Sequence, residues 1–131
     1  MGDDMGGDAA QPLDPQPLDG VRILALEQMQ ALPFATQLLA RLGADVVKVE
    51  PASGDSGRAS LPAVTDPRGR RVGATFLRNN LNKRSVCVNL KDPRGRDLVL
   101  RLAPRFDVIA ENSKAGSMAR LGLVVVFVPL L

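Results

Sequence analysis

The 131-residue chain contains no histidine, tryptophan or tyrosine, and it has a single cysteine. Without histidine, no site built from this sequence can use an imidazole base or an imidazole metal ligand, which excludes Ser-His-Asp and Cys-His catalysis. Aromatic residues make up 3% of the chain, so its core has to be built from aliphatic side chains. We therefore predict an aliphatic core and no metal site.

The single cysteine, Cys87, lies in the apolar run 85–90. We predict a buried thiol that acts as a small hydrophobic group, in preference to a reactive nucleophile, because no base is near it in the sequence. The acidic N-terminus lacks the apolar segment of a signal peptide, and the apolar stretch 121–131 is too short to span a bilayer. We expect a cytoplasmic protein with no membrane partner.

Charge is distributed unevenly along the chain. The net charge is +3, yet the first twenty residues carry five aspartates and neither lysine nor arginine. Residues 1–19 have too little apolar surface to offset the entropy of ordering, so they are predicted to be a disordered leader, with an acidic interaction arm as the alternative. The rest of the chain is basic, which favours an anionic partner.

The organising stretch, residues 21–50, has the pattern of a strand, a helix and a second strand. The apolar run 21–26 predicts a strand covered on both faces. Pro33 is expected at the first helical position, apolar residues then recur at helical spacing through Leu42, and Gly43 ends the helix. A strand over 44–50 follows, so the two strands should be parallel, with ligands bound near 27–32 and 50–58 at their carboxyl ends.

The remaining elements extend the same pattern. Residues 51–74 are expected to form a long loop, 75–81 either a short helix or an extended segment, and the polar cluster 82–85 a solvated patch. Asp92 and Pro93 predict the start of a helix that continues to Leu102. Together these features predict a Rossmann-like α/β fold with a mostly parallel sheet of about four or five strands flanked by helices. Its further elements are strands over 86–90 and 107–112 and a helical turn over 117–121.

The turn after the first strand lacks the glycines of a dinucleotide-binding fingerprint, since residues 27–32 read EQMQAL. Dinucleotide binding of the usual kind is therefore disfavoured. The free N–H groups at the start of the following helix can still hold an anion or the polar end of a ligand.

Five segments carry a resemblance to a known family, in the order PLDGVRIL, PFATQLLARLGADVVKVEP, SGDSGR, NLNKRSVCVNLKDPRGR and DVIAENSKAGSMARLGL. Together they resemble the N-terminal part of the family III CoA-transferases of the CaiB/BaiF type. This group contains formyl-CoA transferase, carnitine CoA-transferase and alpha-methylacyl-CoA racemase. The resemblance covers roughly residues 17–123 and implies a family α/β portion over 20–123, incomplete relative to the full-length fold, followed by an apolar tail over 124–131.

The resemblance implies a binding site for CoA or acyl-CoA. Lys91 and Arg120 are chemically apt for its phosphates, and the alternative is that both are surface cations. The sequence departs from the family pattern at Leu32, at Asn89 and at 112–116, where the family commonly has glycine, aspartate and NFRPG. The implied CoA-binding residues are Gln30, Ala31, Val88, Asn89, Leu90, Lys91, Asn112, Ser113 and Arg120.

In that family, CoA moves from an acyl-CoA to a carboxylic acid through an acyl-enzyme formed on an aspartate. By family spacing that aspartate would follow Leu131, so we predict no catalytic residue here and expect a truncated chain that binds CoA without catalysis. Full-length relatives form interlocked homodimers, whereas the oligomeric state of this chain stays open, as does the choice between transferase and racemase chemistry.

Two alternatives come from other classes. One is a non-catalytic nucleotide- or nucleic-acid-binding module that uses the cations of 58–71 and 82–85; it is disfavoured because no aromatic residues interleave with them to stack bases. The other is a product that does not fold stably, in which the apolar tail 124–131 is an aggregation hazard. The same tail has the composition of a fifth strand.

Overall fold

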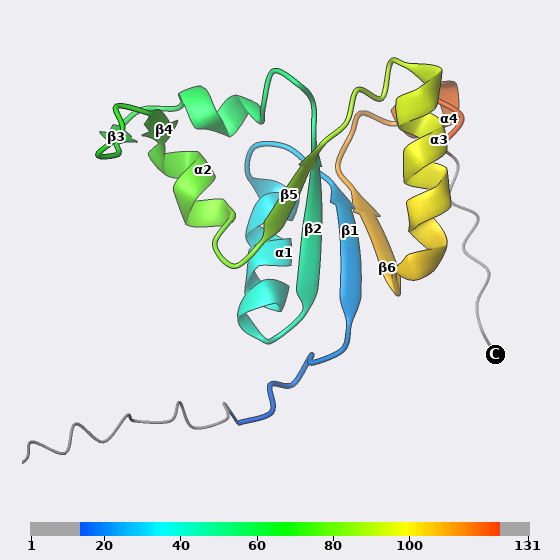
Figure 1. Ribbon diagram of the computed structural model, residues 1–131, viewed down its shortest axis with the longest axis horizontal. Helices are drawn as coiled ribbons and strands as arrows, with labels where there is room; N and C mark the ends of the chain where they lie inside the picture. The colour runs from blue at the N-terminus through cyan, green and yellow to red at the C-terminus, as the bar shows by residue number, and fades with distance from the viewer. Residues whose placement is uncertain (1–13, 124–131) are drawn as a thin grey trace, which may run out of the picture.

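The computed structural model describes residues 14–123, which form a parallel β-sheet covered on both faces by helices (Figure 1). The strand order is β5-β2-β1-β6, and every pairing in this sheet is parallel. This is the order of the first four strands of a doubly wound Rossmann sheet, so the predicted fold class is confirmed. The strands are β1 (Arg22–Leu26), β2 (Asp45–Glu50), β5 (Arg84–Cys87) and β6 (Val108–Glu111).

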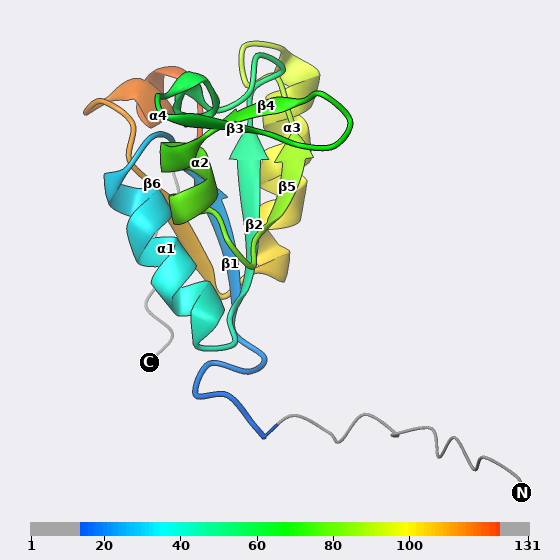
Figure 2. The ribbon, with the colours of Figure 1, turned by 90° about the vertical axis from the view of Figure 1, so that its left-hand side faces the viewer.

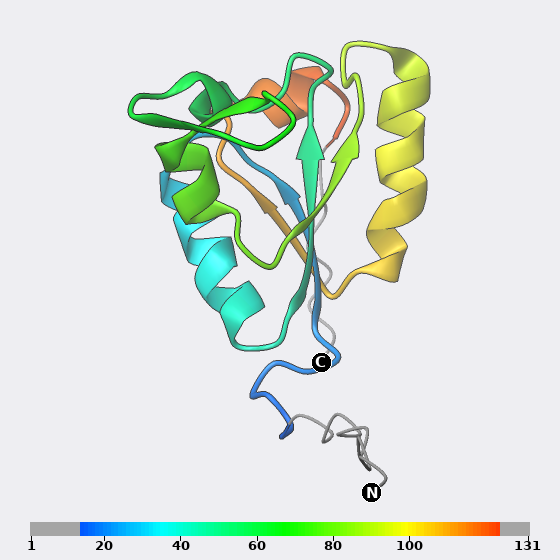
Figure 3. The ribbon, with the colours of Figure 1, turned by 60° about the vertical axis from the view of Figure 1, so that its left-hand side comes forward.

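Helices α1 (Ala31–Arg41) and α2 (Ala74–Asn79) lie on one face of the sheet, and α3 (Pro93–Leu102) lies on the other (Figures 2 and 3). Successive residues of a strand point to opposite faces, so β1 supplies Ile23 and Ala25 to one core and Leu24 and Leu26 to the other. Both cores are aliphatic, as predicted. The α1 side holds Ile23, Ala25, Ala40, Ala44 and Val46, and the α3 side holds Leu24, Leu26, Val49, Val88, Val99 and Leu123.

Helix α1 turns a different face to the sheet than its apolar pattern indicates. It begins at Ala31, two residues before Pro33, and it ends before Gly43, whose φ of +103° confirms the predicted stop. Phe34, Leu38 and Leu42 are exposed, whereas the residues buried against the rest of the domain are smaller or polar. Small side chains allow close packing on the sheet, and the Thr36 hydroxyl donates to the buried Glu27 carboxylate at 2.7 Å. The buried residues of α1 are Pro33, Thr36, Gln37 and Ala40.

The segment predicted as a long loop, 51–74, contains regular structure. It forms the 3-10 helix η1 (Ser56–Ala59) and an antiparallel hairpin of β3 (Ala63–Thr65) and β4 (Arg71–Gly73), whose turn is closed by Asp66. Its pattern gave no sign of these elements because the strands have three residues each, too few for a period to be read. Helix α2 follows directly, so the undecided segment 75–81 is helical in its first part.

Strand β5 begins and ends earlier than predicted, and Cys87 at its end is exposed. The prediction of a buried thiol is therefore wrong. Strand β5 lies at the edge of the sheet, so its residues are less covered by neighbouring elements than those of a central strand. The start of α3 is as predicted, since the Asp92 carboxylate accepts a hydrogen bond from the Arg94 N–H and Pro93 occupies the first turn. An additional 3-10 turn, η2 (Ala103–Arg105), follows α3, and the short helix α4 (Ser117–Arg120) comes after β6.

The predicted leader and tail fall mostly outside the described residues. Within residues 14–19, the Leu18 N–H donates to the Leu42 carbonyl at 2.8 Å, and the Leu18 side chain packs against the core on the α1 side. Residues 1–13 and 124–131, including the possible fifth strand, lie outside the description. Over residues 14–123, no helix combines the length and apolar character needed to cross a bilayer.

Candidate functional site

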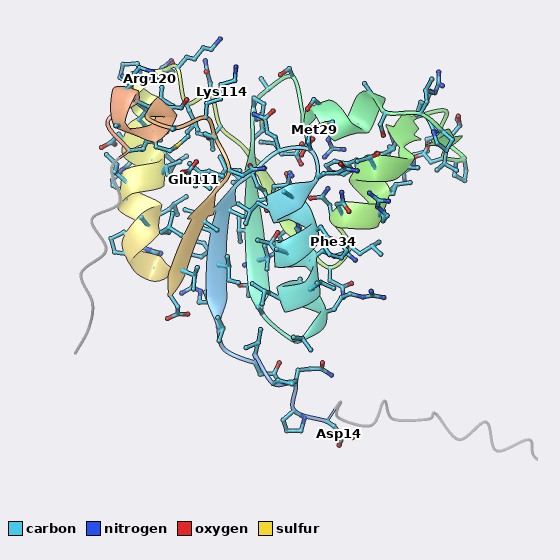
Figure 4. All side chains as sticks on the ribbon, turned by 180° about the vertical axis from the view of Figure 1, so that it is seen from behind. Asp14, Met29, Phe34, Glu111, Lys114 and Arg120 are labelled. Carbon is cyan, nitrogen blue, oxygen red and sulfur yellow. The ribbon has the colours of Figure 1, made fainter. Side chains whose placement is uncertain are left out.

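A cleft with a volume of about 630 Å³ lies at the carboxyl ends of the parallel strands. Its walls are the turn after β1, the segment after β5 and the segment between β6 and α4. After β1 the chain turns to one face of the sheet and after β6 it turns to the other. Open α/β sheets bind their ligands at such a point. Figure 4 shows Met29, Lys114 and Arg120 at this end of the molecule.

The cleft brings together six of the nine residues implied as CoA-binding. The remaining three, Gln30, Ala31 and Arg120, do not line it. Gln30 and Ala31 begin α1 with exposed side chains, and Arg120 lies on α4, where its guanidinium donates to the Ser117 hydroxyl, a cleft group, at 3.0 Å. Their contact with CoA stays a prediction. The six residues that line the cleft are Val88, Asn89, Leu90, Lys91, Asn112 and Ser113.

The side chain of Asn112 ties β6 to the turn after β1. Its Oδ1 accepts the Gln28 N–H and its Nδ2 donates to the Gln28 carbonyl, both at 3.0 Å. Two reciprocal hydrogen bonds fix the separation of the two cleft walls. Asn112 therefore shapes the cleft through the protein backbone in addition to facing it.

The segment after β5 is held in place by α3. The Arg96 guanidinium donates to the carbonyls of Leu90 and Lys91, at 3.2 and 3.0 Å, and the Lys91 N–H donates to the Asn89 side chain. Gly95 lies so close to Asn89 that a Cβ at position 95 would overlap the Asn89 carbonyl. The glycine thus allows the first turn of α3 to pack directly on the cleft wall.

Lys114 is a cleft cation that was not predicted from the sequence. It lines the cleft and also a smaller, mostly apolar cavity of about 290 Å³ between α3 and α4. The signal was available, because Lys114 directly follows Ser113 in a segment already assigned to the site. Lys91, Lys114 and Arg120 give this end of the sheet three exposed cations.

A buried ion-pair network, which was not predicted from the sequence, lies next to the cleft. Lys48 donates to Asp55 at 2.6 Å and its ammonium lies 3.6 Å from Glu27, while Lys83 donates to Glu27 at 2.6 Å. All four side chains are at most 2% exposed. The prediction of a solvated patch over 82–85 is therefore wrong for Lys83. A lysine inside the apolar run VVKVE was the signal for a buried partner.

Two further side chains complete this network. The Arg58 guanidinium makes two hydrogen bonds to the Glu50 carboxylate, at 2.9 and 2.8 Å, and stacks on the Phe76 ring with its central carbon 3.7 Å from the ring centroid. The Glu50 carboxylate also accepts from the Ser85 hydroxyl and the Asp55 N–H. The segment 50–58, which was predicted to bind ligand, is thus largely occupied by internal contacts.

These contacts shift the pKa values of the groups involved. Burial opposes ionisation of Glu50 and Asp55, but hydrogen bonds outweigh it, chiefly from Arg58 to Glu50 and from Lys48 to Asp55, so both carboxyl pKa values lie below their usual range. Burial lowers the pKa of Lys83, and the hydrogen bond to Glu27 only partly offsets this effect. The two carboxyls are therefore held ionised at neutral pH, as acceptors for the surrounding donors.

Most cations of the two segments considered for nucleic-acid binding are paired within the protein. In 82–85, Lys83 contacts Glu27 and Arg84 makes an ion pair with Asp45 at 2.6 Å. In the hairpin, Arg70 pairs with Asp66 at 2.6 Å. Over residues 14–123, no cluster of three or more cysteine, aspartate or glutamate side chains has an arrangement that can hold a metal ion.

Comparison with known proteins gives one consistent relationship. A family model described as CoA-transferase family III matches residues 18–125. The chain is 46% identical over 109 residues to succinyl-CoA:glutarate CoA-transferase of Mus musculus, covering 82% of this chain and 24% of that protein. It is 45% identical over 103 residues to succinyl-CoA:mesaconate CoA-transferase of Haloarcula marismortui, covering 79% and 26% respectively.

Solved structures agree with the sequence matches. The crystal structure of a CaiB/BaiF family protein from Brucella suis superposes with a TM-score of 0.79 at 38% identity, covering 85% of this chain and 29% of that one. The chain spans about a quarter of the length of the curated relatives it matches. Both the sequence and the fold identify the chain as a member of CoA-transferase family III, corresponding to the N-terminal region of that family.

Proposed function

We propose that this chain forms the CoA-binding wall of a family III CoA-transferase. The observation that carries the proposal is the cleft itself, which gathers six of the residues implied by the family resemblance at the carboxyl ends of four parallel strands. Because the matched relatives have names of CoA-transferases, transfer is favoured over racemase chemistry. The acyl donor and the acceptor acid are left open.

The chemistry of the cleft fits a phosphorylated ligand with an uncharged arm. Lys91 and Lys114 line the cleft and are exposed, so their ammonium groups are available to the pyrophosphate or the 3′-phosphate of CoA. Arg120 does not line the cleft itself, but its guanidinium donates to the hydroxyl of Ser117, which does. The apolar residues Val49 and Leu121 line the same cleft and offer surface to the uncharged pantetheine arm.

The buried carboxylates are poorly placed to act as the reaction's nucleophile. Glu27, Glu50 and Asp55 each accept hydrogen bonds from cations and are almost inaccessible to solvent. An attacking carboxylate needs an exposed oxygen within reach of the thioester. Together with the family spacing, which puts the reactive aspartate after Leu131, this supports our proposal that residues 14–123 bind CoA and that the nucleophile of the transfer reaction lies outside them.

Titration of the ¹⁵N-labelled full chain with CoA, followed by amide chemical shifts, tests this function. We expect shifts for residues 88–91 and 112–114 that saturate, and none for the hairpin 63–73, which lies away from the cleft. Incubation of the same chain with succinyl-CoA and glutarate should give no transfer. Absence of any shift at millimolar CoA, or shifts confined to the hairpin, would rule the proposal out.

A further inference from the structure

The turn between β1 and α1 contains a residue in an intrinsically unfavourable conformation. Met29 has a φ of +65°, in the left-handed region that side-chain-bearing residues rarely adopt. For an unbranched, apolar side chain this conformation is unfavourable, because the Cβ lies close to the following carbonyl oxygen and the side chain has no polar group to compensate locally. The surrounding structure must therefore hold Met29 in place, and Met29 lines the cleft.

Two buried side chains hold the Met29 backbone, one through its N–H group and the other through its carbonyl. The Asp55 carboxylate accepts the Met29 N–H at 3.2 Å, and the Asn79 side-chain amide donates to the Met29 carbonyl at 3.3 Å. Asp55 precedes η1 and Asn79 ends α2, so both reach the turn from other elements. We refer to Asp55 and Asn79 as the Met29 clamp.

The acidic half of the clamp is itself fixed by the ion-pair network. The second oxygen of Asp55 accepts from Lys48 at 2.6 Å, and its first oxygen also accepts the Gly57 N–H at 2.7 Å. The Asp55 N–H donates to Glu50. With both carboxylate oxygens and its own N–H engaged, Asp55 cannot rotate away from Met29 without breaking buried hydrogen bonds.

The residue before Met29 is held independently. Gln28 exchanges two hydrogen bonds with Asn112, so the turn is attached to β6 at one residue and to the clamp at the next. A segment held in this way needs little reordering when a ligand arrives, which increases affinity because less entropy is lost on binding. A buried network adjoining a cleft thus has a consequence for binding in addition to stability.

We propose that Asp55 and Asn79 are positioning residues that hold Met29 in its left-handed conformation and so preorganise the Gln28–Met29 wall of the cleft for CoA. The proposal rests on the proposed function for its ligand. Neither side chain needs to touch the ligand, since both act through the Met29 backbone.

The first part of the proposal, that the clamp holds Met29 in the left-handed conformation, is tested without ligand. In the unliganded full chain, the ¹³Cα and ¹³Cβ shifts and the HN–Hα coupling of Met29 should indicate the left-handed region. In Asp55→Asn, the side chain cannot accept hydrogen bonds on both of its former oxygen positions, and in Asn79→Leu the donor to Met29 is lost at similar volume. Both variants should shift residue 29 toward negative φ. If residue 29 keeps its wild-type shifts in both, the clamp is refuted.

The second part of the proposal, the effect on CoA binding, is tested by comparing the clamp variants in the Met29 and Met29→Gly backgrounds. Each clamp variant should weaken CoA binding about fivefold or more in the Met29 background, the ratio that corresponds to the left-handed penalty. Glycine adopts the left-handed region about as readily as the right-handed one, so in a Met29→Gly background the same variants should weaken binding less than about twofold. Equal losses in both backgrounds would show that the clamp acts only on overall stability, and would overturn the proposal.

Asp66→Asn is the matched control. Asp66 also accepts two backbone N–H groups and an arginine, but in the β3–β4 turn, so its substitution should leave CoA affinity and the Met29 shifts unchanged. If Asp55→Asn does not fold, Asn79→Leu decides alone. If the wild-type chain binds no CoA, the proposed function fails, and the unliganded Met29 shifts still decide whether the clamp exists.

Discussion

At the scale of single residues, the buried charged side chains of this fold lie next to charges of the opposite sign. Three carboxylates and three cations form the network beside the cleft: Glu27, Glu50 and Asp55 with Lys48, Arg58 and Lys83. Taking a charge out of water is costly, and the cost is recovered only when every charge has a partner with good geometry. The network is therefore sensitive to loss of any one member.

Lys48→Met is expected to reduce the free energy of unfolding by about 3 kcal/mol, because it leaves the Asp55 carboxylate buried without its cation. Urea denaturation followed by circular dichroism measures the loss. Arg101→Ala, which removes an exposed ion pair to Asp97, is the control and should cost less than about 0.5 kcal/mol. A loss for Lys48→Met as small as that of the control would contradict the importance assigned to the network.

Lys91→Ala is expected to weaken CoA binding about threefold to tenfold, the effect of removing one charged hydrogen-bond donor from a phosphate contact. Isothermal titration calorimetry at low and high salt measures it, and the difference between variant and wild type should shrink at high salt because charge screening weakens the contact. Arg101→Ala, at the opposite end of α3, should bind as wild type. Unchanged affinity in Lys91→Ala would remove Lys91 from the site.

At the scale of elements, helix α3 and the segment after β5 behave as one unit. Arg96 donates to two carbonyls of that segment, and Gly95 packs against a third. The helix start is defined locally by Asp92 and Pro93. Its position relative to the sheet is defined by contact with Asn89, which requires a residue without a Cβ.

Gly95→Ala tests this contact. In an ordinary helix alanine would be stabilising, but here its Cβ would overlap the Asn89 carbonyl, so we expect a net destabilisation of about 1–3 kcal/mol. The displaced 89–91 segment should also bind CoA more weakly. Urea denaturation and calorimetry measure the two effects, with the exposed Asp97→Ala as control in the same helix. A stabilised Gly95→Ala would show that the helix moves away at no cost.

At the scale of the whole molecule, stability should depend on pH through the network. The pKa values of Glu50 and Asp55 are lower in the folded chain than their ordinary values of 4.5 and 3.8. The folded state thus binds fewer protons than the unfolded state across that range. The stabilisation is complete above about pH 4.5 and is lost as the pH falls through the lowered, folded-state values.

We therefore expect the urea midpoint to stay nearly constant from pH 7 to about pH 5 and to fall progressively below about pH 4.5. The pKa of Lys83 is also lowered in the folded chain, chiefly because burial disfavours its charged form, and this cost is relieved as the pH rises through its folded-state value. Urea titrations followed by circular dichroism at fixed ionic strength measure how the midpoint falls in acid. A midpoint independent of pH between 6 and 3 would contradict the assigned carboxyl shifts.

The element order and the place of the cleft follow from local patterns. The run 21–26, the stop at Gly43 and the start at Asp92 depend on residues within a few positions of one another, and the structure confirms each of them. The cleft lies at the carboxyl ends of the strands because parallel sheets place these ends together, and six of the residues implied by the family resemblance line it.

The sequence alone determined a strand–helix–strand domain of CoA-transferase family III with its cleft at one end of the sheet, since neighbouring residues set periodicity and caps. Only the tertiary structure decided that α1 exposes Phe34 and Leu38, that Cys87 is exposed, and that the Lys83 side chain is buried. The hydrogen bonds that hold Met29 and Glu27 join residues 26, 50 and 56 positions apart in the chain. No local pattern contains such partners, because packing alone brings them together.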